Sequence, residues 1–284
     1  MRSYKEVLRE AQKQMVELDM GDQAAQVYMV ELTNMAAHDL YMEFDEDMPK
    51  ELEMQYIAGI DRMLKGEPLG HVLGYEWFYG YQFEVNEHVL IPRPETEELV
   101  ANILAGYDEF FADSESVCAV DVGTGSGAIA IAVKKEEPAI LMMGTDISQD
   151  AIQVAQENAK KNQVSIPFIA GDMLQPLIER NLKVDILISN PPYIPSEEAM
   201  ESSVVDYEPH VALFGGEDGL KFYRIIFESC KQVLKERSMM AFEMGWNQGE
   251  AMSALVEAYF PEARYEILKD MSGKDRMLFV YFNL

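Results

Sequence analysis

The sequence predicts an α/β fold built on a mostly parallel sheet, preceded by a helical region and a β-hairpin. Three patterns carry this prediction: helical apolar stripes up to about residue 66, alternating aromatic residues over 74–91, and strand-like segments alternating with helix-like ones from about residue 117. Strands that alternate with helices form a parallel sheet covered on both faces. The chain of 284 residues is long enough for roughly two domains.

The first part of the chain contains helical signals only. Apolar side chains recur every three or four residues over 7–18, 25–36 and 52–64, which predicts three amphipathic helices. Gly21 interrupts the first pattern, and a Gly-Glu-Pro run at 66–68 ends the third.

A hairpin and a new helix are expected next. Aromatic residues alternate around Gly80, as on the two strands of a β-hairpin. The segment 95–99 begins a helix with acidic residues in its first turn, where they favour the helix dipole. Arg93 and Glu97 are four residues apart; they either touch substrate or pair with each other, and we favour the pair.

The remainder predicts the sheet. Helices are expected over 128–133, 151–162, 219–235 and 248–259. Short apolar runs predict seven strands, at 117–122, 139–145, 166–170, 184–189, 238–243, 263–268 and 276–282.

Charge and cysteine content narrow the function classes. With 23 basic and 50 acidic residues the net charge is −27, which disfavours binding of nucleic acid through a broad basic surface. Such a field favours a cationic ligand or a partner with a basic patch, or serves solubility alone. Two cysteines build no disulfide framework, which fits a reducing cytoplasm, and no apolar stretch reaches the ~18 residues of a membrane span. The four histidines are scattered, so no metal site is expected.

A glycine-rich turn follows the first strand of the expected sheet. Residues 121–127 read D-V-G-T-G-S-G, and glycines allow a ligand to approach the backbone closely. Open α/β sheets bind ligands at this edge, and an acid after the next strand, Asp146, can accept hydrogen bonds from ribose hydroxyls. The glycine-rich turn and Asp146 together indicate an adenosine-containing cofactor, without identifying which one. The alternative is a tight turn followed by a helix cap. Asp172 and Met173 end the third strand and either border adenine or form an ordinary turn.

The fourth strand ends directly in Asn-Pro-Pro-Tyr. An amide or aromatic-amine nitrogen is a poor nucleophile, because its lone pair is delocalised. The Asn190 side-chain oxygen and the Pro191 carbonyl can hold both N–H groups and turn that lone pair toward an electrophile. The prolines fix the loop, and Tyr193 offers a flat wall for stacking. Simple strand termination by proline is the alternative.

These motifs together resemble the HemK/PrmC family, the peptide chain release factor glutamine N5-methyltransferases, which are class I methyltransferases using S-adenosyl-L-methionine. The glycine turn, the following acid and N-P-P-Y carry the general likeness. The closer likeness covers about residues 66–284, whereas the N-terminal region matches in helical type only. It rests on F-Y-G at 78–80, F-E-V at 83–85, V-L-I-P-R-P-E-T-E at 89–97, E-P followed by A-L-F-G-G-E-D-G-L within 208–220, and G-K-D-R at 273–276.

The resemblance implies a Rossmann-like class I methyltransferase fold, with a mostly parallel seven-stranded sheet and a small all-helical N-terminal domain joined by a β-hairpin. The implied domains are 1–73 for substrate recognition, 74–92 as hairpin linker and 93–284 for methyl transfer. The implied cofactor is S-adenosyl-L-methionine, with S-adenosyl-L-homocysteine as product. Its implied binding residues are Gly123, Thr124, Gly125, Ser126, Gly127, Asp146, Asp172, Met173 and Asn190.

The implied substrate is the glutamine of a Gly-Gly-Gln loop in class 1 release factors. Asn190, Pro191 and Tyr193 are the implied catalytic residues, and Pro192 joins them in binding substrate. Many family members carry Trp where this chain has Met173, which makes the adenine contact softer. The implied protein is a cytoplasmic monomer that binds neither nucleic acid directly nor membranes.

Other functions fit parts of the pattern. N-P-P-Y also occurs in adenine N6-methyltransferases, and a ribosomal protein is an alternative glutamine substrate. A nicotinamide-dependent oxidoreductase shares the sheet, but the G-x-G-x-G spacing and N-P-P-Y disfavour it. A non-catalytic adaptor is the remaining class.

Overall fold

The computed structural model describes residues 1–198 and 206–284. Its contacts divide the described chain into two compact units: the first comprises Met1–Tyr75 together with 206–207, and the second comprises 76–198 together with Glu208–Leu284. The domain boundaries expected at 73 and 92 stay predictions. No helix within the described residues is both long and apolar enough to cross a membrane.

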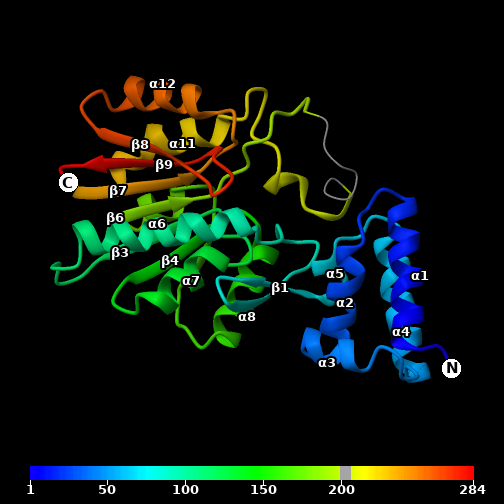
Figure 1. The fold of residues 1–284 in the computed structure, drawn as a ribbon. Helices are drawn as coiled ribbons and strands as arrows, with labels where there is room; N and C mark the ends of the chain where they lie inside the picture. The colour runs from blue at the N-terminus through cyan, green and yellow to red at the C-terminus, as the bar shows by residue number, and fades with distance from the viewer. Residues whose placement is uncertain (199–205) are drawn as a thin grey trace. The chain divides into compact units, whose positions relative to one another are not determined.

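The first unit is helical, as predicted (Figure 1). Ser3 begins the first helix with a capping box, in which its hydroxyl accepts from the Glu6 N–H and the Glu6 carboxylate accepts from the Ser3 N–H. In the core Tyr56 stacks on Tyr28, with ring centroids 5.3 Å apart, and donates a 2.8 Å hydrogen bond to the Ala25 carbonyl. The three expected helices are joined by two short ones that the sequence pattern missed. The five are α1 (Tyr4–Glu17), α2 (Gln23–Thr33), α3 (Ala37–Met42), α4 (Lys50–Met63) and α5 (Leu69–Leu73).

The predicted hairpin is present as β1 (Tyr75–Phe78) and β2 (Tyr81–Glu84). Tyr79 and Gly80 both have positive φ, 52° and 77°, which is the backbone of a tight hairpin turn. The following helix, α6 (Pro94–Phe110), begins with a proline whose fixed φ suits a first helical position.

Within the described residues seven strands form one sheet in the order β5-β4-β3-β6-β7-β9-β8, which confirms the predicted mostly parallel α/β fold. Among the described strands of this sheet, β9 alone runs in the opposite direction, antiparallel to both β7 and β8. The strands are β3 (Cys118–Val122), β4 (Leu141–Asp146), β5 (Phe168–Ala170), β6 (Val184–Ser189), β7 (Leu234–Glu243), β8 (Arg264–Lys269) and β9 (Asp275–Phe282).

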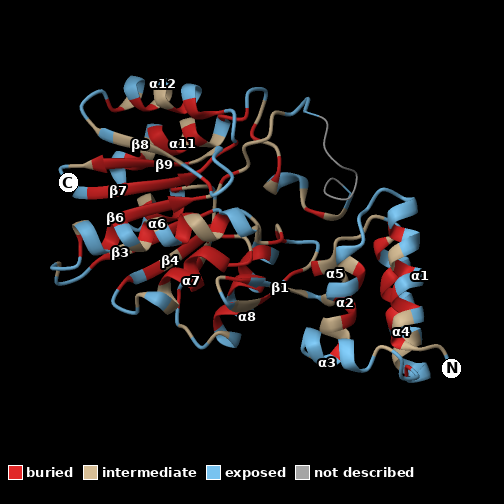
Figure 2. Ribbon diagram, in the orientation of Figure 1, coloured by how far each residue is buried: buried red, intermediate tan, exposed pale blue. Residues whose placement is uncertain are grey.

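Helices cover both faces of this sheet, and its central strands are buried (Figure 2). Alternate residues of a strand point to opposite faces, so Ala119 joins one core cluster and Val120 the other. Side chains of α6, α7 (Ala128–Glu136) and α8 (Gln149–Lys161) pack in the first cluster. The second contains residues of α9 (Gln175–Glu179), α11 (Lys221–Ser229) and α12 (Gly249–Tyr259).

One predicted element is too long. The helix expected over 219–235 ends at Ser229, a 3-10 turn follows (Cys230–Gln232), and β7 begins at Leu234. Apolar residues keep a helical period up to Val233, but pairing with β6 takes over there, since the Val184 N–H donates to the Val233 carbonyl at 2.8 Å. Tertiary pairing thus overrides the local pattern.

Candidate functional site

A pocket of about 370 Å³ opens at the carboxyl edge of the sheet, and every residue lining it belongs to the second unit. Parallel strands bring their carboxyl ends to this edge, so the loops after β3, β4, β5 and β6 meet there. Nine sequence-predicted residues line it: Gly123, Thr124, Gly125, Ser126, Asp146, Asp172, Met173, Asn190 and Pro192.

Hydrogen bonds to β4 hold the glycine turn in place. The N–H groups of Gly123 and Thr124 both donate to the Thr145 carbonyl, at 2.8 and 2.9 Å. The Gly125 N–H donates to one oxygen of the Asp146 carboxylate and the Ser148 N–H to the other, each at 2.9 Å. Burial raises the pKa of Asp146, while these N–H groups act against the rise. Each oxygen keeps a further acceptor site, so the carboxylate can still receive a pair of hydroxyls.

Asp121 lies beneath the turn and is fully buried. It accepts a 2.6 Å hydrogen bond from the Thr124 hydroxyl, and its Oδ1 has no partner among the described residues. Burial raises its pKa to about 7. The same carboxyl therefore changes charge near neutral pH.

Asn158 of α8 ties the turn to the hairpin. Its side-chain oxygen accepts from the Glu84 N–H at 2.7 Å, and its amide nitrogen donates to the carbonyls of Glu84 and Ser126 at 3.0 and 2.9 Å. With three bonds this buried amide is satisfied and fixes the orientation of the strand and the turn.

The residues of N-P-P-Y divide between the pocket and the core. Asn190 and Pro192 line the pocket, Pro191 is buried, and Tyr193 packs against the second core cluster. The Tyr193 hydroxyl donates to the Glu243 carboxylate at 3.3 Å, and burial raises its pKa. Of the described residues, Gly127, Pro191 and Tyr193 are the predicted site residues outside the pocket lining.

The expected pair between Arg93 and Glu97 is wrong. Arg93 instead forms an ion pair with Glu208, whose other oxygen accepts from the Ile91 N–H at 3.2 Å. Glu97 accepts from the Tyr79 N–H at 2.7 Å, at the hairpin turn. Both acids therefore bind backbone groups of segments distant in sequence, and Glu208 is almost completely buried as it does so.

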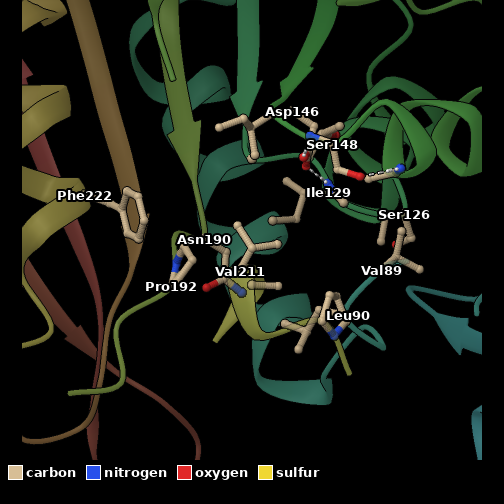
Figure 3. Close-up of a pocket in the computed structure, with 18 of the residues that line it drawn as sticks. Val89, Leu90, Ser126, Ile129, Asp146, Ser148, Asn190, Pro192, Val211 and Phe222 are labelled. Carbon is tan, nitrogen blue, oxygen red and sulfur yellow. Dashed lines mark hydrogen bonds between the residues drawn. The ribbon is translucent and has the colours of Figure 1, made fainter. Parts of the chain in front are cut away.

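Sequence reasoning assigned no role to much of the pocket wall (Figure 3). Val89 and Leu90 come from the loop between β2 and α6, and Val211 and Phe222 from the segment after residue 206. Apolar residues give no local sign of lining a pocket rather than a core. Glu243, which no prediction included, could have been found as an acid ending a buried apolar strand at the same edge.

No three His, Cys, Asp or Glu residues among 1–198 and 206–284 are grouped to hold a metal ion. The polar groups that line the pocket at this edge include the Asp146 carboxylate, the backbone of the glycine turn and the Asn190 carboxamide.

Two family profiles and several known proteins are similar to this chain. A family profile described as "PrmC N-terminal domain" matches residues 6–74, and one described as "Methyltransferase small domain" matches 108–206. The chain is 40% identical to the release factor glutamine methyltransferase of Bacillus cereus, over 98% of this chain and 99% of that protein. It is 38% identical to the one of Staphylococcus aureus, over 98% and 99%.

A solved structure shares the fold. The crystal structure of a methyltransferase from Pyrococcus furiosus matches with a TM-score of 0.52 at 14% identity, over 79% of this chain and 98% of that chain.

Proposed function

Because the chain belongs to the release factor glutamine methyltransferase family, we propose that it methylates the side-chain amide nitrogen (N5) of the glutamine in the Gly-Gly-Gln loop of class 1 peptide chain release factors. Near-complete coverage at 38–40% identity supports this assignment. The observation that carries it is the position of Asn190, a carboxamide on the wall of the pocket that holds the glycine turn and Asp146.

The pocket suits S-adenosyl-L-methionine. The Asp146 carboxylate can accept further hydrogen bonds from ribose hydroxyls, and the glycine turn allows close approach to the backbone. Ile147 and Met173 add apolar side chains to the same pocket wall, which also includes Asp172. When bound, this cofactor supplies a methyl group on a positively charged sulfur and leaves as S-adenosyl-L-homocysteine. Gly123–Gly127, Asp146, Asp172 and Met173 are the residues that we propose to hold it.

The chain's own part in the reaction is to orient the substrate amide. The Asn190 side-chain oxygen and the Pro191 carbonyl are proposed to accept the two N–H groups of the glutamine. This fixes the nitrogen with its lone pair directed out of the amide plane, and the same oxygens favour the positive charge that develops on nitrogen. The methylated nitrogen then loses one proton to solvent, so no strong base is needed before attack. Tyr193 is proposed to support this corner.

The test is transfer of labelled methyl groups to purified class 1 release factors, with whole ribosomes and duplex DNA as competing substrates. We expect label on the release factor, as a 14-dalton gain on the glutamine of its Gly-Gly-Gln loop. Label confined to a ribosomal protein or to DNA would replace the proposed substrate with one of the alternatives.

Replacing Asn190 with alanine tests the proposed role of the carboxamide. Loss of one aimed polar group typically lowers a rate by about 10²–10³-fold, so we expect kcat to fall on that scale in Asn190→Ala. The affinity for S-adenosyl-L-homocysteine, measured by calorimetry, should change little. Asn102→Ala on α6 is the matched control, because its amide donates to the Glu98 carbonyl and to the Met277 sulfur and does not line the pocket. An equal loss of cofactor affinity would make Asn190 a structural residue instead.

A further inference from the structure

Glu243 is a buried carboxylate beside the proposed catalytic corner. It ends β7, and the register of β7 on β6 pairs Phe242 with Ser189, so the next residues along the two strands are Glu243 and Asn190. Its exposed fraction is 2%. A buried acid of this kind costs stability unless its oxygens are well satisfied, so its partners bear on its role.

Donors surround this carboxylate. The Thr96 hydroxyl lies 2.6 Å from Oε2, and the Tyr193 hydroxyl lies 3.3 Å from Oε1. Burial raises the pKa of Glu243, while hydrogen bonding by Thr96, Tyr193 and Asn190 and the positive charge of Arg276 act against that rise. The Thr96 hydroxyl carries a single proton, and it donates that proton to Glu243 Oε2.

The direction of that proton determines how Asn190 is oriented. The Asn190 Nδ2 atom lies 3.4 Å from the Thr96 oxygen, which has only lone pairs left on that side. An amide donates through nitrogen and accepts through oxygen. If the amide of Asn190 turned over, its oxygen would face another oxygen without a proton between them, which is repulsive. The stable arrangement therefore points the Asn190 nitrogen at Thr96 and leaves the Asn190 oxygen free of Thr96. Because Asn190 lines the pocket, this oxygen is available to a bound substrate.

We propose that Glu243, acting through the Thr96 hydroxyl, is a positioning residue that holds the Asn190 carboxamide with its oxygen available to the substrate glutamine. The proposal rests on the proposed function, because it assigns the free oxygen to the amide of a glutamine substrate. The three side chains come from β7, α6 and the loop after β6, so the orientation of one catalytic group depends on three separate elements.

Substitutions at Thr96 separate this role from packing. The hydrogen bonds from Asn190 to Thr96 and from Thr96 to Glu243 form a relay. Thr96→Val keeps the shape of the side chain and removes this relay, whereas Thr96→Ser keeps the hydroxyl. We expect Thr96→Val to lower kcat for release factor methylation by about 10- to 100-fold, by analogy with the outer partners that orient metal ligands. The KM for the release factor and the Kd of S-adenosyl-L-homocysteine should stay within about threefold, and Thr96→Ser should retain kcat within about threefold.

Glu243→Gln tests the other end of the relay. Its amide can donate to Thr96, which releases the threonine proton to Asn190 and turns that carboxamide over, so kcat should again fall. Because both changes break one relay, the double variant should lie within about threefold of Thr96→Val alone. The matched control is Ser238→Ala, which removes a buried hydroxyl in the middle of β7, five residues from Glu243, that has no hydrogen-bond partner among the described residues.

Three outcomes overturn the proposal: a loss in Thr96→Val no larger than in Ser238→Ala, a loss in Thr96→Ser equal to that in Thr96→Val, or losses that multiply in the double variant. Thermal unfolding and calorimetry with S-adenosyl-L-homocysteine show that each variant is folded. A wild type that binds S-adenosyl-L-homocysteine but methylates no release factor would refute the proposed function first, and the relay with it.

Discussion

Asp121 carries a fully buried carboxyl group whose pKa, through burial, rises from 3.8 to about 7. The folded chain therefore keeps a proton on Asp121 at pH values where the unfolded chain has released it. The resulting contribution to the free energy of unfolding is fully present below about pH 4 and is lost as the pH rises through about 7. Above about pH 7, Asp121 is ionised in the folded chain as well, and burying its negative charge lowers the free energy of unfolding.

Replacing Asp121 with asparagine removes this titration and keeps an oxygen that can accept from Thr124. Each unit of pKa difference corresponds to about 1.4 kcal/mol. The wild type should therefore lose on the order of a few kcal/mol of unfolding free energy relative to Asp121→Asn between about pH 4 and pH 8. Urea unfolding of both proteins across this range measures the difference. Parallel curves would mean that Asp121 ionises as freely in the folded chain as in the unfolded one.

Two of the three glycines in the turn between β3 and α7 differ in their surroundings. Gly123 and Gly127 both have positive φ, 74° and 79°. A Cβ on Gly123 would meet nothing within 4 Å, whereas one on Gly127 would lie 3.1 Å from both the Ala155 Cβ and the Ile131 Cδ1. Gly127 thus sets how closely α7 and α8 approach, while Gly123 is required by backbone conformation alone.

Alanine substitutions separate the two requirements. The left-handed conformation costs an alanine about 1–2 kcal/mol, and we expect Gly123→Ala to lose this amount of unfolding free energy. Gly127→Ala should lose more, because Ala155 must also shift, including its Cα at 3.3 Å. Urea unfolding with S-adenosyl-L-homocysteine absent isolates stability from binding. A larger loss in Gly123→Ala would assign the close packing to the wrong glycine.

Elements with a long periodic pattern could be predicted from the sequence, and those set by contacts could not. The strand at 184–189 was predicted with its observed bounds, since six buried residues leave no other periodicity. The start of β7 was not, because Leu234 joins the strand only through pairing with β6. Short helices such as α3 and α5 carry too few turns to show a stripe.

The site followed the same rule. Residues at the ends of strands, such as Asp146 and Asn190, could be placed together because parallel topology fixes their edge. The partner of Arg93 could not, because Glu208 is 115 residues away along the chain and no local spacing indicates it. The relay from Glu243 depends likewise on the packing of α6 against the sheet.

At the scale of the whole molecule, the two units have separate cores. One cluster of buried residues lies within the helices of Met1–Tyr75, and the residues lining the pocket all belong to the unit that starts at Glu76. The match to "PrmC N-terminal domain" covers 6–74, nearly the same helical segment. Cofactor binding and release factor recognition can therefore be separated experimentally.

A chain that begins at Glu76 tests this separation. Because no pocket residue is removed, its Kd for S-adenosyl-L-homocysteine should stay within about threefold of the full chain. If the helical unit helps to hold the release factor, kcat/KM for methylation should fall at least about tenfold, which corresponds to about 1.4 kcal/mol of lost interaction. Calorimetry and steady-state kinetics give the two numbers separately. Loss of S-adenosyl-L-homocysteine binding by the shortened chain, with its fold retained by circular dichroism, would show that the helical unit supports the pocket itself.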